Sequence, residues 1–173
     1  MMDFKEIVQR RRSIRKFTDE QVSDDDLKTI LRAALMSPTG HSKRAWKLFV
    51  VRDKEQLQAL SQCKSAGAEY LAGASVAVVV AYDTDATDVW IEDASIAAVS
   101  MQYQATELGI GSCWSQIRLR GTEDGVTADS NIRALLKYED NYQTLCVIGF
   151  GYPDAERKMQ DESRLKWDSV VGL

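Results

Sequence analysis

The pattern of apolar and polar positions predicts helices that alternate with strands. The clearest helix begins after Ser23, because Asp26 follows three residues later as in a capping box and apolar residues then recur every three or four positions. Pro38 and Gly40 end this helix. Similar patterns predict further helices over residues 3–12, 53–63, 88–108 and 128–137.

Four short apolar runs predict strands. Residues 75–82 and 144–152 are apolar without alternation, which is typical of strands covered on both faces. Shorter strands are predicted over residues 47–51 and 110–117. Because strands and helices alternate, the fold class is α/β or α+β, with a sheet of four or five strands flanked by helices. No linker or repeat divides the chain, so residues 1–173 are predicted to form one domain.

The helix predicted over residues 88–108 is rich in small side chains. Such side chains allow a close approach of two backbones. We therefore expect this helix to be central and to pack against other helices or against a partner subunit. The small residues are Ala94, Ser95, Ala97, Ala98, Ser100, Ala105 and Thr106.

Composition narrows the class of protein. The chain has 173 residues, 45% of them hydrophobic, which is enough for a core of its own, and a net charge of −4 that disfavours general nucleic-acid binding. No apolar run approaches the ~20 residues of a membrane span, and no secretory signal is visible, so we expect a cytoplasmic protein without membrane association. The cysteines Cys63, Cys113 and Cys146 form no CxxC pair, which argues against a disulfide framework and a metal site.

Common catalytic motifs are missing from the sequence. His41 is the only histidine and has no nucleophile beside it, and neither a GxSxG nor a GxxxxGK[ST] segment occurs. The segment GIGSCW, residues 109–114, lacks the third glycine of a dinucleotide fingerprint. The sequence therefore gives no support to a hydrolase or a P-loop protein.

A cluster of arginines follows the first predicted helix. The segment RRRSIRKF, residues 10–17, holds four arginines and a serine within six positions. Guanidinium and hydroxyl groups suit planar recognition of a phosphate. The alternatives are a solvated basic face or a nucleic-acid patch. Two features weigh against these alternatives: the rest of the chain is acidic, and the run ends in the apolar Ile14 and Phe17.

This cluster resembles the opening motif of the FMN-dependent nitroreductase family. Similar segments follow in the family's order over almost the whole chain, as in its short subgroup: residues 36–46, 91–118, 147–154 and 163–167. The resemblance implies an α+β, nitroreductase-like fold with a central mixed β-sheet of four to five strands flanked by helices. It also implies a homodimer with two FMN sites at the dimer interface.

The resemblance further implies which residues hold FMN. Arg11 is expected at the phosphate and Arg15 near the pyrimidine end of the ring. Arg164 matches a contact from the tail, although Glu162 stands where relatives often carry another basic residue. The complete set implied is Arg11, Arg12, Ser13, Arg15, Thr39, Trp114, Ser115, Gln116 and Arg164. Trp114 could equally be a core aromatic at a sheet edge.

The second motif departs from the family pattern. Ser42, Arg44 and Ala45 replace the usual Asn, Gln and Pro, while Thr39 keeps a hydroxyl. His41 and Arg44 are therefore candidates for the substrate pocket, with a preference for anionic substrates as one consequence. The alternative for Arg44 is a pair with an acidic surface residue.

The function implied is an oxidoreductase that uses NADH or NADPH to reduce nitroaromatics, quinones or a related small electrophile by a ping-pong mechanism. FMN carries this chemistry, so no side chain is needed as an acid or base. Two alternatives stay open: a non-catalytic flavin-binding sensor or storage protein, and another flavin reaction on the same scaffold, such as reductive dehalogenation. The physiological acceptor and the choice between NADH and NADPH stay open too.

Overall fold

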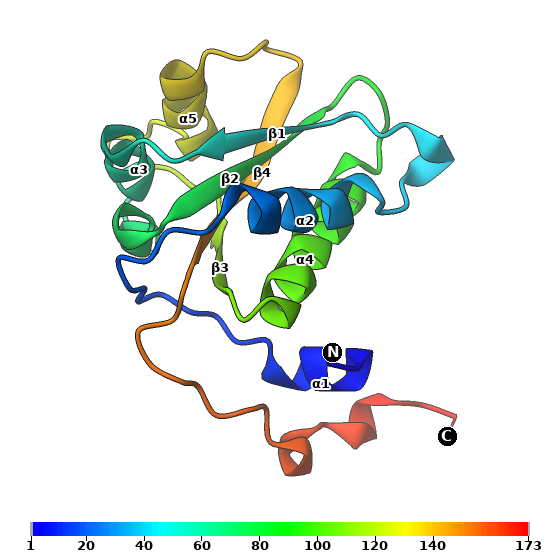
Figure 1. Cartoon of the computed structure of the whole chain (residues 1–173). Helices are drawn as coiled ribbons and strands as arrows, with labels where there is room; N and C mark the ends of the chain where they lie inside the picture. Colours follow the sequence, from blue (N-terminus) through cyan, green and yellow to red (C-terminus); the bar gives the residue numbers. More distant parts are fainter. Residues whose placement is uncertain (1, 173) are drawn as a thin grey trace.

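A four-stranded sheet forms the centre of the fold in the computed structural model, which describes residues 2–172 (Figure 1). Its strands are β1 (Trp46–Val51), β2 (Val76–Asp83), β3 (Gly111–Gln116) and β4 (Tyr142–Gly151), in the order β1-β2-β4-β3. All four predicted strands are confirmed, as is the α+β class.

The expectation of a mixed sheet is wrong in one respect. All three ladders of the sheet are antiparallel. The reason is that the connection from β1 to β2 and the connection from β3 to β4 each leave and re-enter the sheet at the same end. Within residues 2–172, parallel pairing is found at an isolated bridge between Ser13 and Ser112.

The predicted helices are also present. Ser23 and Asp53 cap α2 and α3, and each side chain accepts a hydrogen bond from a backbone N–H three residues later. The α-helices are α1 (Phe4–Arg10), α2 (Asp24–Leu35), α3 (Lys54–Ser61), α4 (Trp90–Glu107) and α5 (Ala128–Leu136). Short 3-10 turns are η1 (Gly40–Ser42), η2 (Glu69–Gly73), η3 (Glu162–Arg164) and η4 (Trp167–Ser169).

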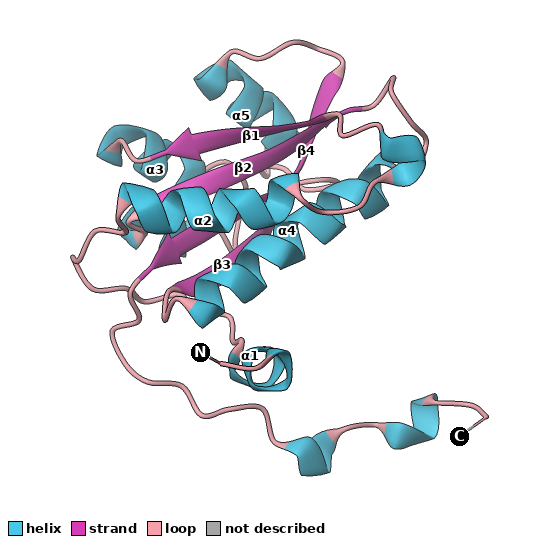
Figure 2. Cartoon of the chain, turned by 45° about the vertical axis from the view of Figure 1, so that its right-hand side comes forward, coloured by secondary structure: helices cyan, strands magenta, loops and turns pink. Residues whose placement is uncertain are grey.

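Helices cover both faces of the sheet (Figure 2). The alternate residues Val78 and Val80 of β2 belong to the hydrophobic core shared with α2 and α4. Ala77 and Val79 belong to the second core, shared with α3 and α5. Both faces of this strand are therefore buried, which explains its continuous apolar sequence.

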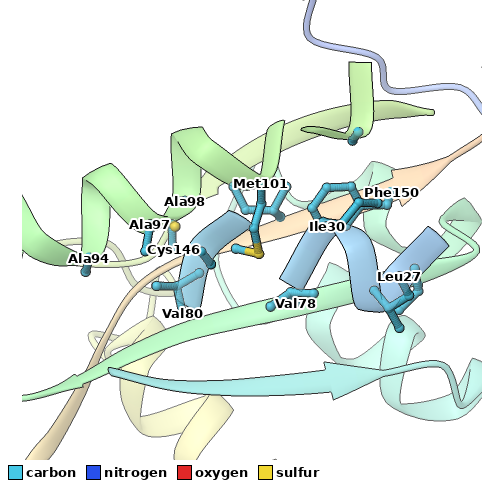
Figure 3. Packing of buried hydrophobic residues seen from close by; sticks show 14 of the residues in the cluster. Leu27, Ile30, Val78, Val80, Ala94, Ala97, Ala98, Met101, Cys146 and Phe150 are labelled. Carbon is cyan, nitrogen blue, oxygen red and sulfur yellow. The ribbon is translucent and has the colours of Figure 1, made fainter. Parts of the chain in front are cut away.

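The alanines of α4 face the inside of the same chain, whereas its small hydroxyl residues are half-buried (Figure 3). Ala94, Ala97 and Ala98 are fully buried in the core that α4 shares with α2 and the sheet. Met101 fills the space beside them. Of the two packing partners expected for this helix, the structure shows another helix. The burial of these alanines does not by itself require a second subunit.

The two ends of the chain lie apart from the sheet, below it in Figure 1. Helix α1 has no buried residue, and Phe4, at the edge of the Tyr103 ring, is 67% exposed. Residues 154–172 are exposed throughout. Between residues 2 and 172, no helix is long and apolar enough to cross a bilayer.

Candidate functional site

One cavity gathers the first motif and the tail. Its volume is about 510 Å³, and we call it the arginine cavity. Five of its lining residues are among the predicted FMN contacts: Arg11, Arg12, Ser13, Arg15 and Arg164. Four were not predicted: Arg157, Gln160, Asp161 and Leu165.

The first motif lies along the start of β3. The backbone N–H of Ile14 donates to the carbonyl of Ser112 at 2.9 Å, and the Ile14 side chain is 7% exposed. In extended backbone, successive side chains point to opposite sides. Ser13 and Arg15 therefore share the side that faces the cavity. Gly111 permits this contact, because a Cβ there would lie 2.9 Å from the Ile14 side chain.

Hydrogen bonds over a long sequence separation bring the tail to the motif. The Arg12 guanidinium donates to the carbonyl of Lys158 at 2.9 Å. The backbone N–H of Gln160 donates to the carbonyl of Gln9 at 2.9 Å, and its side-chain amide donates to the carbonyl of Val8 at 3.1 Å. These contacts set the path of the tail and place Arg157 at the cavity.

Arg157 supplies a positive charge that the family resemblance leads one to expect at position 162. Glu162 occupies the expected position of a second basic residue, and its carboxylate lies 3.9 Å from Lys5 on the exposed surface. Arg157, five residues earlier, lines the cavity instead. The only signal for it in the sequence was its place in a charged tail, because the path of the tail depends on contacts with α1.

The arginine cavity has an excess of positive charge. Its lining holds five arginines and one carboxylate, Asp161. Asp161 accepts hydrogen bonds from the backbone and hydroxyl of Ser163, which hold the pKa of its carboxyl below the ordinary value. Among the described residues, none of the five arginines is paired with a carboxylate. Unpaired guanidinium groups beside a serine hydroxyl form a donor set that fits a phosphate.

The three predicted residues of β3 are not among the described residues that line this cavity. The indole N–H of Trp114 donates to the side-chain oxygen of Gln116 at 2.9 Å. Ser115 is buried, and its hydroxyl donates to the carbonyl of Gly67 at 3.3 Å. Trp114 also packs against the core of α2 and α4, so the alternative of an aromatic at the sheet edge describes its packing correctly.

Two further polar side chains, which the sequence reasoning missed, reach β3. The Tyr70 hydroxyl donates to the carbonyl of Cys113 at 2.8 Å. Burial raises the pKa of Tyr70, and the nearby charge of Arg15 acts in the opposite direction. The Lys64 ammonium donates to the carbonyl of Gln116 at 2.9 Å, and burial lowers its pKa. Both residues belong to the irregular segment between α3 and β2, where the sequence has no periodic pattern of apolar residues.

The second motif lies in a different place. Residues 38–45, which we call the Thr39 loop, connect α2 to β1 and project at one side of the sheet, whereas the arginine cluster runs below it (Figure 1). The described lining of the arginine cavity does not include Thr39, His41 or Arg44. His41 and Arg44 are exposed. Within residues 2–172 Arg44 has no ion pair, so the alternative of an acidic surface partner is not what the structure shows.

Comparison with known proteins decides the family. The sequence model of the nitroreductase family matches residues 8–69 and 62–152, which together span most of the chain. The chain belongs to the nitroreductase family. Members with related sequences include a protein of Archaeoglobus fulgidus, 36% identical over 85% of this chain and 83% of its own length. Another, from Methanothermobacter thermautotrophicus, is 32% identical over 96% of this chain and 88% of its own. Both are provisionally named NADH dehydrogenase/NAD(P)H nitroreductase.

A solved structure of the family has nearly the same fold. It is described as an FMN-dependent nitroreductase from Clostridium difficile R20291. It is 45% identical to this chain, covers 96% of both chains and superimposes with a TM-score of 0.94. The nitroreductase-like fold expected from the sequence is thus confirmed.

Proposed function

We propose that this protein is an FMN-dependent oxidoreductase that takes electrons from NADH or NADPH and passes them to nitroaromatics, quinones or related small electrophiles. The observation that carries the proposal is the arginine cavity, which Ser13 lines together with five arginines that have no carboxylate partner among the described residues. The names of the relatives support the same cofactor and electron donor.

The arrangement of the cavity indicates which of its residues would contact each part of FMN. Arg11 and the tail residues Arg157 and Arg164 would hold the phosphate. Arg15 follows Ile14, whose backbone is hydrogen-bonded to β3, and from this place in the cavity it would meet the pyrimidine end of the ring. When bound, FMN supplies hydride and electron transfer between a nicotinamide and the acceptor. The side chains of the protein then have only to bind the cofactor and orient the substrates. The electron donor and the acceptor would occupy the same site one after the other.

We further propose that the site is completed in a homodimer. The Thr39 loop does not line the cavity of its own chain, and in a dimer it would cover the cavity of the partner. Apolar side chains at both ends of the chain support an interface. Phe4 is 67% exposed, Trp167 63% and Val171 97%. Exposed apolar residues gathered on neighbouring segments are typical of interaction surfaces.

The sharpest test of the cofactor compares FMN with riboflavin, which lacks the phosphate. Titration of the apoprotein with each ligand should give much weaker binding of riboflavin. Charge-assisted hydrogen bonds contribute about 1.5–3 kcal/mol each, so the loss should be roughly a hundredfold or more. Equal affinities for the two ligands would contradict the assignment of the cavity to a phosphate. A flavin sensor would pass this test, and turnover of NAD(P)H with a quinone then separates it from an enzyme.

A further inference from the structure

A buried carboxylate is hydrogen-bonded to the Thr39 loop. Asp93 lies in the first turn of α4 and is 3% exposed. Its Oδ1 accepts a hydrogen bond from the backbone N–H of Gly40 at 2.8 Å. Its Oδ2 accepts a hydrogen bond from the hydroxyl of Tyr82, a fully buried residue of β2, also at 2.8 Å. Asp93 thus connects the loop to both the sheet and α4.

The loop needs such support because its backbone is unusual. His41, Ser42 and Arg44 have φ values of 52°, 55° and 49°, in the left-handed region that residues other than glycine rarely adopt. Backbone of this kind persists only where the surroundings determine it, and it is common at functional sites.

The bonds within the loop cannot fix its position on the body of the protein. The N–H of Arg44 donates to the Thr39 hydroxyl oxygen at 3.2 Å, and the N–H of Lys43 donates to the carbonyl of Gly40 at 3.1 Å. Both bonds shape the loop internally, whereas the Gly40–Asp93 bond attaches its middle to α4. Gly40 also lies close to Val89, the residue before α4: a Cβ on Gly40 would be 2.5 Å from a Val89 methyl carbon.

A simpler role for Asp93 is to stabilise the start of its helix. A carboxylate in the first turn does interact favourably with the helix dipole. However, the hydrogen bonds of Asp93 go to Gly40 and Tyr82, and the start of α4 has no side-chain cap. The neighbouring Glu92 also provides a first-turn charge and is exposed.

We propose that Asp93, oriented by Tyr82, is a positioning residue for the flavin site: it presets the Thr39 loop in the conformation that meets the FMN bound by a partner subunit. This inference rests on the function proposed above. A preset loop binds with less loss of conformational freedom than a mobile one, so its contacts contribute more fully to affinity. Loss of the anchor should therefore weaken FMN binding although Asp93 itself is not required to touch the cofactor.

The test is titration of FMN into the apoprotein of each variant, at a temperature where all are folded. Asp93→Ala should raise the Kd of FMN roughly tenfold, as expected when a buried hydrogen-bond anchor is lost. Asp93→Asn keeps an oxygen for the Gly40 N–H and should recover most of the affinity. Gly40→Ala moves the loop without altering Asp93 and should reproduce the loss, so the test stands even if Asp93→Ala does not fold.

Asp129 offers a matched control. Its carboxylate accepts hydrogen bonds from the N–H of Thr144 at 2.7 Å and from the Tyr138 hydroxyl at 3.0 Å, and it lies in α5, on the other face of the sheet. Asp129→Ala should lower the melting temperature and leave the Kd of FMN unchanged. A merely structural role for Asp93 predicts the same behaviour for Asp93→Ala.

A double variant identifies the route of the effect. If Asp93 acts through the loop, adding Asp93→Ala to Thr39→Ala should weaken FMN binding by less than the product of the two separate effects. An unchanged Kd in both Asp93→Ala and Gly40→Ala, or fully multiplicative effects in the double variant, would overturn the inference alone. Failure of the unaltered protein to bind FMN would contradict the proposed function, and this inference would fall with it.

Discussion

At the scale of single residues, two arginines of one motif have different surroundings. Arg11 lies at the end of α1, whereas Arg15 lies close enough to Tyr70 to influence its pKa. A contact to the phosphate is the same in oxidised and reduced FMN. A positive charge beside the pyrimidine end of the flavin ring favours the reduced form, because negative charge accumulates there on reduction. Arg11 should therefore contribute mainly affinity, and Arg15 mainly reduction potential.

Two substitutions test this division. Arg11→Ala should weaken FMN binding roughly ten- to a hundredfold, from a contact of about 1.5–3 kcal/mol. Arg15→Ala should lower the midpoint potential, with a smaller loss of affinity. Titration of each apo-variant with FMN and a potentiometric titration of each complex give the two quantities. If the effects are exchanged between the variants, the motif has been aligned in the wrong register.

Arg157 gives a second prediction at this scale. Because it lines the arginine cavity, Arg157→Ala should weaken FMN binding roughly tenfold, as should Arg164→Ala. Glu162→Ala is the control, since this side chain faces Lys5 at the exposed surface and should leave the Kd unchanged. Equal weakening by Arg157→Ala and Glu162→Ala would contradict a direct contact of Arg157 with FMN, because the two substitutions change the net charge in opposite directions.

The sequence predicted part of this site and not all of it. The motif at residues 11–15 and Arg164 could be found, because arginine and serine in close spacing carry a chemical signal of their own. Arg157 could not, since its position depends on hydrogen bonds between Gln160 and α1. Asp93 was visible only as one acidic residue at a helix start, and its bonds to Gly40 and Tyr82 arise from the tertiary packing.

At the scale of elements, periodicity was sufficient where one face or both faces are buried. Helix α2 and strand β2 agree with their predicted positions to within two residues, because burial in the core imposes their patterns. Helix α1 was predicted from its apolar residues as well, yet Phe4 remains exposed in the single chain. The small residues of α4 predicted close packing, but not whether the neighbour would be α2 or another subunit.

Buried groups in β2 and in the turn after α3 predict how the free energy of unfolding depends on pH. Burial raises the pKa of Cys63 from 9.0 to about 11 and, with the hydrogen bond to Asp93, the pKa of Tyr82 from 10.0 to about 12. Between about pH 9 and 12 the folded protein therefore holds more protons than the unfolded chain, so the free energy of unfolding should fall as the pH rises. Lys64, whose pKa is lowered, has the opposite effect on the free energy of unfolding, but it is one group against two.

Urea unfolding at a series of pH values from 8 to about 11 measures this slope. Cys63→Ala removes one of the titrating groups and should make the decline less steep. A free energy of unfolding that stays constant or rises over this range would show that the buried thiol and phenol do not control alkaline stability.

At the scale of the whole molecule, the position of the Thr39 loop and the exposed apolar ends point to a dimer. Sedimentation should show a dimer at micromolar concentration, with FMN bound. A stable interface of this kind buries on the order of 2,000 Å² or more. A folded monomer that binds FMN at the same concentration would contradict the proposal that the partner completes the site.

Electron transfer from a nicotinamide through bound FMN is the function that we propose for this protein. The most direct measurement is anaerobic mixing of the FMN-saturated protein with NADH or NADPH, followed by the visible absorbance of the flavin. We expect at least one donor to bleach the flavin, and the absorbance to recover when a quinone or nitroaromatic is added. An FMN-saturated protein that neither NADH nor NADPH can bleach would contradict it.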